Sequence, residues 1–279
     1  MNDNDSNDSN EMHASSDRPE LVDIGVNLAH RRFDADREAV LARARAAGVT
    51  RMLITGTSAD SSRAAAALAR TRPGELYSTA GIHPHDAKHA SSAALAELRA
   101  LARGPEVRAI GECGLDFDRD FSPRPAQEVA FAAQLELAAE TGLPVFLHER
   151  AAHARFLAIL AHARPRLKAA VVHCFTGTGA ELDAYLALDL HIGITGWIND
   201  ERRGLGLRAL VARIPTDRLM IETDAPFLTP RDAKPRPRDG RNEPALLPLV
   251  LAAVAHATGR DARAVAKETT RTARAFFGI

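Results

Sequence analysis

The sequence predicts a (β/α)8 barrel, and three observations support this fold class. Short apolar runs alternate with alanine-, leucine- and arginine-rich segments of helical character, which is typical of a parallel sheet covered on both faces. Eight such runs occur, and the seven intervals between Val26 and Glu222 average 28 residues, close to the ~30 residues of one βα unit. An open doubly wound sheet is the alternative, but no glycine-rich dinucleotide-binding motif follows the first run.

The expected strands are the eight apolar runs, and a helical segment follows each of them. The runs cover 21–26, 51–55, 76–81, 107–112, 144–148, 169–173, 190–195 and 218–222, and the helical segments include 34–48, 124–142 and 151–163. Gly48 and Gly142 stand where helix C-caps belong. Pro144 is the first residue of its run, a strand position that tolerates proline. No linker interrupts residues 20–279, so we expect one barrel domain.

Composition narrows the classes of protein. Of the 279 residues, 46% are hydrophobic and 26% charged, which is ordinary globular composition. Residues 1–19 contain five acidic residues and one arginine, a net charge of −4, so that residues 20–279 carry +4. This segment is expected to be a disordered acidic tail, and it has no apolar core of a signal peptide. The mild positive charge of the remainder permits an anionic substrate.

The apolar and cysteine content indicates where the protein works. The longest apolar stretch, residues 245–255, contains Pro248 and is far shorter than the ~20 residues of a membrane-spanning helix. Two cysteines, Cys113 and Cys174, cannot build a secreted-type disulfide framework. We therefore expect a cytoplasmic protein that does not associate with membranes and is a monomer.

Histidines and carboxylates collect at the ends of the predicted strands, which is where the active sites of such barrels lie. His83 and His85 follow the third strand, and two further acids, Asp116 and Glu222, stand near the same rim. Four residues end or follow the fourth, fifth, sixth and eighth strands: Glu112, His148, His173 and Asp224. Imidazole and carboxylate donors from different strands are what a divalent metal site requires. Any one of them alone could instead cap a helix.

Other segments near this rim have more than one interpretation. Pro84 fixes a turn between His83 and His85, so the two rings could contact a substrate phosphate, transfer a proton or pack beneath a loop. The loop after the eighth strand is basic, with Arg231, Lys234, Arg236, Arg238 and Arg241 against Asp232 and Asp239. It suits a phosphodiester backbone or is a solvated loop. Trp197, which follows the seventh strand, could stack on an unpaired base or belong to the core.

The same segments resemble the TatD family of metal-dependent nucleases. The motifs are DIGVNL (23–28), TAGIHPHD (79–86), AIGECGLDF (109–117), PVFLH (144–148), VVHCFTG (171–177), IGITGWINDERRGL (192–205), LMIETDAPFLTPRD (219–232) and GRNEP (240–244). They cover nearly all of residues 20–279, and GECGLDF, HCFTG and ETDAP in this order are highly specific. The resemblance implies an amidohydrolase-like barrel that hydrolyses phosphodiester bonds of DNA, usually with Mg²⁺. For one branch it implies a 3′–5′ exonuclease that prefers single-stranded DNA or RNA.

By position, the resemblance also implies roles for individual residues. Glu112, His148 and His173 fall on the metal ligands, and Asp224 falls on an acidic position that is a further ligand or the base. His83 and His85 fall near the scissile phosphate. Most relatives carry an HxH pair where this chain has Gly25 and Asn27. Fewer nitrogen donors favour Mg²⁺ over Zn²⁺, with one ion, or two when phosphate oxygens supply ligands.

The functional hypothesis is metal-dependent hydrolysis of single-stranded DNA or RNA. Mg²⁺ would bind a phosphate oxygen and a water, and Asp224 would deprotonate that water. Arg231, Lys234, Arg236, Arg241 and Trp197 would contact the substrate. Two alternatives remain: a small-molecule amidohydrolase or lactonase on the same barrel, and a non-catalytic nucleic-acid-binding protein.

Overall fold

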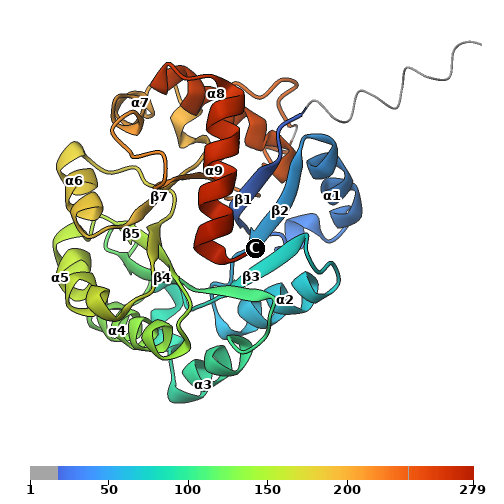
Figure 1. Cartoon of the computed structure of the whole chain (residues 1–279). Helices are drawn as coiled ribbons and strands as arrows, with labels where there is room; N and C mark the ends of the chain where they lie inside the picture. The colour runs from blue at the N-terminus through green and yellow to red at the C-terminus, as the bar shows by residue number, and fades with distance from the viewer. Residues whose placement is uncertain (1–17, 238) are drawn as a thin grey trace, which may run out of the picture.

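The computed structural model describes residues 18–237 and 239–279, and it confirms the predicted (β/α)8 barrel (Figure 1). Most of the predicted acidic tail, residues 1–17, and Arg238 of the basic loop lie outside the described residues. The strands are β1 Leu21–Val26, β2 Val49–Ile54, β3 Leu76–Ala80, β4 Val107–Asp116, β5 Val145–Arg150, β6 Ala170–Val172, β7 His191–Ile194 and β8 Leu219–Ile221. They form one sheet in chain order, and every neighbouring pair is parallel.

Helices connect the strands and cover the outside of the sheet (Figure 1). They are α1 Arg37–Ala46, α2 Ala59–Arg70, α3 Ser92–Leu101, α4 Arg124–Thr141, α5 His153–Ala163, α6 Gly179–Ala187, α7 Leu205–Val211, α8 Leu247–Thr258 and α9 Ala262–Phe277. Gly142 caps α4 in the left-handed conformation, as its position in the sequence predicted. In the described ranges, no helix combines the length and the apolarity that crossing a membrane needs.

The two edges of the sheet meet between β1 and the segment that follows β8. The Asp224 amide donates to the carbonyl oxygen of Gly25 at 2.8 Å, and the Asn27 amide donates to that of Ala225 at 2.7 Å. Asp23, which is fully buried, accepts from the Thr223 amide at 2.9 Å. These contacts bring the C-terminal end of β1 beside Asp224.

The interior of the barrel is apolar below the level of these polar residues. Its buried side chains include Val22, Ile24, Leu53, Ala109, Phe146, Val171 and Met220, which form one cluster with Ala273, Phe276 and Phe277 of α9. Figure 1 shows α9 running across the barrel, with the C-terminus of the chain close to the centre. This apolar cluster, together with α9, fills one end of the barrel. The polar residues therefore gather at the other end, where the C-terminal ends of the strands lie.

The main difference from the predicted elements is the length of β4. The predicted run ended at Glu112, but β4 continues to Asp116, because Cys113–Asp116 pair with Leu147–Arg150 of β5 after a register shift. The register shift lies between Ile110 and Cys113 and so includes Gly111, while Gly114 comes just after it; glycines in a strand often mark such an irregularity. Glu112 therefore lies inside a strand, and Asp116 stands at its end.

Candidate active site

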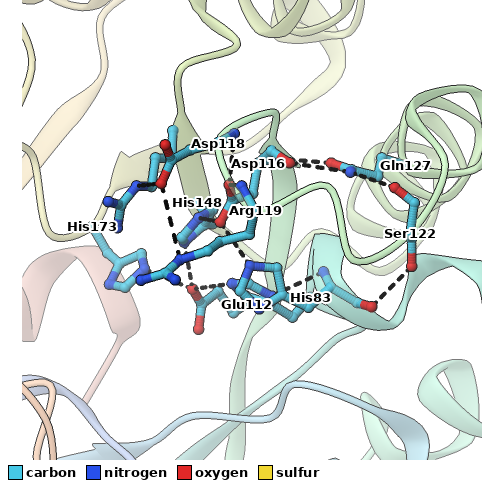
Figure 2. A network of polar contacts seen from close by, with 11 residues as sticks. His83, Glu112, Asp116, Asp118, Arg119, Ser122, Gln127, His148 and His173 are labelled. Atoms are coloured by element: carbon cyan, nitrogen blue, oxygen red, sulfur yellow. Dashed lines mark hydrogen bonds and ion pairs between the residues drawn. The ribbon is translucent and has the colours of Figure 1, made fainter.

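The Glu112 carboxylate is the centre of a cluster of imidazole rings (Figure 2). Its Oε1 atom lies 2.7 Å from Nε2 of His173, 2.9 Å from Nδ1 of His148 and 3.3 Å from Nε2 of His83. The four residues come from β4, β5 and the segments after β6 and β3, so that distant parts of the chain meet at one oxygen atom. Glu112 and His173 are almost completely buried, at 5% and 6% exposure. Among the described residues, Glu112 has only imidazoles as ion-pair partners.

The glycines around Glu112 explain how β4 brings it so close to β5. Gly111 has φ +135° and Gly114 has φ +146°, values that non-glycine residues rarely adopt. A Cβ at Gly111 would overlap the carbonyl oxygen of Phe146, and a Cβ at Gly114 would overlap that of His148. The two glycines thus let the backbones of β4 and β5 approach on both sides of Glu112. The GECG sequence is therefore a geometric requirement for placing this carboxylate beside His148.

The electrostatics of the cluster favour positive charge at Glu112. Burial alone would raise the pKa of Glu112, but the charges of His173 and His83 and the hydrogen bonds from His148 and His173 hold that pKa well below its ordinary value. Burial alone would lower the pKa of His173, whereas the carboxylates of Glu112 and Glu222 raise it well above the ordinary value. A divalent cation would supply this positive charge in place of the imidazolium protons.

The donor set fits a divalent metal ion. One ligand atom each from His83, Glu112 and His148 lie within 4.8 Å of one another, and His173 reaches the same Glu112 oxygen. His148 Nε2 and Glu222 Oε2 are buried and make no hydrogen bond in the described structure, although each has an ion-pair neighbour at 3.4–3.5 Å, and buried polar atoms of this kind leave room for a ligand. Nitrogen and carboxylate oxygen donors at these distances are those of catalytic metal sites. His83, Glu112 and His148 therefore form a cluster that could hold a metal ion.

Asp224 and Glu222 follow β8 and face the cluster from the other side of the barrel. Asp224 accepts a hydrogen bond from Nδ2 of Asn27 at 3.1 Å. Burial, assisted by repulsion from Glu112 and Glu222, raises the pKa of Asp224 to about 7, although His173 opposes the rise. A carboxylate with a pKa near neutrality is suited to accept a proton from water.

Glu222 was outside the predicted set of site residues, and the structure places it at the centre of the barrel. It is fully buried, accepts from the Cys174 amide at 2.6 Å, and lies 3.5 Å from Nδ1 of His173. Its carboxylate fills the space beside Gly25, where a Cβ would overlap Oε2 of Glu222 and lie 3.1 Å from Cζ of Phe146. The glycine at this position therefore makes room for a carboxylate. The sequence placed Glu222 at the end of the eighth predicted strand, near the rim, but it indicated no role for this residue.

His85 points to a second carboxylate, so the two rings of the HPH segment have different partners. Nε2 of His85 lies 2.7 Å from Oδ2 of Asp116, which is 3.4 Å from Nε2 of His148. The His83 and His85 rings are edge to face, with centroids 4.2 Å apart. Gln127 anchors Asp116 by accepting from its amide at 2.8 Å and donating to its carbonyl oxygen at 3.1 Å. Figure 2 shows Asp116 and Gln127 near Glu112 and His148, and the contacts of Asp116 orient both His85 and His148.

The residues of the predicted basic loop differ in their surroundings. Arg231 forms an ion pair with Asp200 at 2.8 Å. Arg241 forms two ion-pair hydrogen bonds with Asp36, at 2.7 and 2.8 Å, and is mostly buried over the ring of Phe33. Lys234 and Arg236 are exposed, and neither has an ion pair within the described residues. Among the described residues of the loop, Lys234 and Arg236 are thus the cations without an ion pair, while Arg241 anchors the loop to the barrel.

Trp197 lies in the short 3₁₀ helix η4, Gly196–Asn199, that follows β7. Its ring is partly buried and packs against the core. The guanidinium of Arg203 covers the ring at 4.4 Å from the centroid. Asp200 holds both Arg203 and Arg231, at 2.9 and 2.8 Å, so one carboxylate joins the segment after β7 to the basic loop.

Comparisons with known proteins identify the family to which this architecture belongs. The model of the family described as TatD related DNase matches residues 22–278. A 3′–5′ ssDNA/RNA exonuclease TatD of Pantoea vagans is 55% identical over 259 residues, which are 93% of this chain and 100% of that protein.

Two solved structures share the fold over the same part of the chain. The crystal structure of YjjV, a TatD homologue of Escherichia coli, has a TM-score of 0.85 and 29% identity, and the match covers 93% of this chain and 98% of that one. An uncharacterised amidohydrolase of Saccharomyces cerevisiae has a TM-score of 0.81 and 25% identity, over 93% of this chain and 100% of that one. The chain therefore belongs to the TatD family.

Proposed function

We propose that this protein is a metal-dependent 3′–5′ exonuclease that acts on single-stranded DNA and RNA. The observation that carries the proposal is the convergence of three imidazoles on Glu112, with His83, Glu112 and His148 grouped closely enough to share a metal ion. The 55% identity to a relative that is named as such an exonuclease supports the choice of substrate and polarity.

We propose Mg²⁺ as the metal, held by Glu112, His148, His173 and Asp224, with His83 close enough to Glu112 and His148 to share it. Glu222 stands where Gly25 leaves space, and it adds a further oxygen donor to the same region. The three carboxylates, Glu112, Asp224 and Glu222, are hard oxygen donors of the kind that Mg²⁺ prefers. One ion fits this set, and a second would need oxygen ligands from the substrate phosphate. When bound, such an ion polarises a phosphate oxygen and makes a neighbouring water more acidic.

The chain's own residues supply the proton transfer and the positioning. Asp224, whose pKa burial raises to about 7, accepts the proton of the attacking water. Asn27 donates to Oδ1 of Asp224, which keeps the carboxylate turned toward the cluster. His83 and His85 contact the scissile phosphate, and Asp116 fixes the direction of the His85 ring.

The basic loop and the segment after β7 bind the rest of the strand. Lys234 and Arg236 provide exposed charge for phosphates, and Arg231 lies beside them on Asp200. Trp197 and Arg203 form a stacked pair that offers a planar surface to a base. Arg241 does not contact the substrate directly. It holds the loop in position, because its guanidinium is bonded to Asp36. We propose that the working form is a monomer.

One experiment tests the activity, the metal and the polarity together. The purified protein is incubated with a 5′-labelled single-stranded oligonucleotide and Mg²⁺, and the products are separated on a denaturing gel. A ladder of progressively shorter labelled products is expected, with none in EDTA or with Glu112→Gln. Release of the labelled 5′ mononucleotide alone would refute the polarity, and activity that survives both EDTA and Glu112→Gln would refute the metal-dependent mechanism.

The amidohydrolase alternative is tested by the charge of the loop. Lys234→Glu together with Arg236→Glu should weaken hydrolysis of the oligonucleotide and reduce its dependence on salt, because fewer counterions are released on binding. A small-molecule amidohydrolase would be insensitive to this change, so unchanged turnover and salt dependence would contradict the role of the loop.

A further inference from the structure

Two exposed phenylalanines stand at the open end of the barrel, next to the candidate active site. Among the described residues, four large hydrophobic side chains are exposed: Phe121, Val129, Leu205 and Phe227. Phe121 is 58% exposed and Phe227 is 47% exposed. Phe121 lies in the loop after β4, and Phe227 lies in the loop after β8. Both loops leave the C-terminal ends of their strands, so both rings belong to the rim of the site.

The ring of Phe121 is held against a residue of the site. It packs edge to face on the His85 ring, with centroids 4.7 Å apart. The neighbouring Ser122 hydroxyl donates to the His85 carbonyl oxygen at 2.8 Å, and Nζ of Lys88 donates to the carbonyl oxygen of Phe121 at 3.3 Å. The His85 ring is itself fixed by Asp116. Phe121 therefore presents its free surface from a fixed position beside His85.

Phe227 is held in the same way near Asp224. Its amide donates to the Asp224 carbonyl oxygen at 3.0 Å, and its carbonyl oxygen accepts from Nδ2 of the buried Asn242 at 2.7 Å. Its ring meets the His30 ring edge to face at 5.7 Å between centroids. The basic loop with Lys234 and Arg236 begins a few residues further along the chain. Along the chain, Phe227 thus stands between Asp224 and the exposed positive charge.

The strand order places the two rings on opposite sides of the cluster. β4 and β8 are four strands apart in an eight-stranded sheet that runs in chain order, so their ends face each other across the mouth of the barrel. A substrate that brings a phosphate to Glu112 must pass between them. Exposed aromatic faces beside a phosphate-binding centre suit unpaired bases, because every base offers a flat surface for stacking.

We propose that Phe121 and Phe227 are base-stacking residues that seat the nucleotides on the two sides of the scissile phosphate. This inference rests on the proposed exonuclease function and adds to it the recognition of the strand end. The body of the strand carries several phosphates and lies toward the basic loop, so Phe227 stacks the penultimate base. The terminal 3′ base, which is released, stacks on Phe121.

The test combines protein variants with substrates that lack one base. Three short 5′-labelled single-stranded DNAs are compared: an unmodified one, one with an abasic 3′-terminal nucleotide, and one with an abasic penultimate nucleotide. The measured quantity is kcat/KM for release of the first nucleotide in Mg²⁺. The variants are Phe121→Ala, Phe121→Tyr and Phe227→Ala. The matched control is Val129→Ala, which removes a 70% exposed apolar side chain from α4.

The expected result is a specific loss of discrimination. The unaltered protein should be about tenfold slower on either abasic substrate, which corresponds to about 1.4 kcal/mol of stacking. Phe121→Ala should be about tenfold slower on the unmodified strand, with no further loss when the terminal base is missing, and it should still discriminate at the penultimate position. Phe227→Ala should show the converse. Phe121→Tyr, which keeps an aromatic ring, should still discriminate against an abasic 3′ end, and Val129→Ala should behave like the unaltered protein.

Two other outcomes overturn the inference, and they differ from a failure of the proposed function. If Phe121→Ala slows all three substrates by the same factor, the ring only supports His85. If the unaltered protein hydrolyses abasic and unmodified ends equally well, neither phenylalanine stacks on a base. An unaltered protein that releases no nucleotide from the unmodified strand in Mg²⁺ would instead refute the exonuclease function, and the stacking role with it.

Discussion

The substitution Gly25→Ala tests how closely Glu222 fills the space beside β1. The added Cβ would overlap Oε2 of Glu222 and lie 3.1 Å from Cζ of Phe146. The carboxylate has little freedom to move, because the Cys174 amide holds Oε1 at 2.6 Å and Nδ1 of His173 lies 3.5 Å from Oε2. A single methyl group should therefore disturb both the packing and the hydrogen bonding of Glu222.

The magnitude follows from these two effects. Overpacking a buried site costs about 1–3 kcal/mol, and weakening a hydrogen bond to a charged carboxylate adds about 1 kcal/mol or more. We expect the free energy of unfolding to fall by about 3 kcal/mol. For a chain of this size that corresponds to a decrease in Tm of about 6–10 °C.

Urea unfolding and thermal melting measure the effect, with Gly206→Ala as the matched control. A Cβ at Gly206, within α7, meets nothing within 4 Å, and alanine is the better helix former, so this variant should be as stable as the unaltered protein or slightly more. Combining Gly25→Ala with Glu222→Ala should cost less than the two single changes together. A Gly25→Ala protein within about 0.5 kcal/mol of the unaltered one would refute the reasoning.

Three further predictions concern pH and metal binding. Below about pH 7, kcat/KM should rise with pH, because Asp224 must be deprotonated to act as the base and burial raises its pKa to about 7. A bound cation lowers the pH at which this rise is half complete. Asp224→Asn should abolish the rise and lower the rate by about 100-fold. Burial lowers the pKa of His191 to about 4, so the folded state binds its proton less readily than the unfolded chain. The free energy of unfolding should therefore fall by up to about 2 kcal/mol between pH 6.5 and 4, after allowance for solvent screening, and His191→Gln should remove this part of the slope in acid titrations. In thermal melts, Mg²⁺ at about 100 times its Kd should stabilise the unaltered protein by about 2.7 kcal/mol. The stability of Glu112→Gln should hardly change when Mg²⁺ is added. Equal stabilisation of the two proteins would contradict the role of Glu112 as a metal ligand.

The fold was predictable because each strand carries its own signal. The run Leu21–Val26 was predicted with the bounds that the structure has, since a buried strand of a parallel sheet is a continuous apolar run. The extension of β4 to Asp116 was not predictable in this way. It depends on the re-pairing of Cys113–Asp116 with β5, which is a contact between segments more than 30 residues apart.

Those residues of the site that lie at the C-terminal ends of strands could be predicted from the sequence. Parallel strands of a barrel bring their C-terminal ends together, so Glu112, His148 and His173 could be expected to lie near one another. The opposite case is Arg241, whose partner Asp36 is 205 residues away. Its positive charge in a basic loop indicated a substrate contact, and no local pattern revealed the ion pair. Charge alone could not separate it from Lys234.

Gly25 and Asn27, which stand at the two positions of the HxH pair, are closely tied to the acids after β8. A histidine at position 25 could not coexist with the buried Glu222 carboxylate, because even a Cβ there overlaps it. Asn27, at the second position, is already engaged with Asp224 at 3.1 Å. Replacing both positions with histidine would therefore require Glu222 to leave its place beside His173 and Asp224 to lose its amide partner. Gly25, Asn27 and the two acids after β8 are thus coupled in this chain: the glycine leaves room for the Glu222 carboxylate, and the asparagine holds Asp224, so a substitution at either position should disturb these carboxylates.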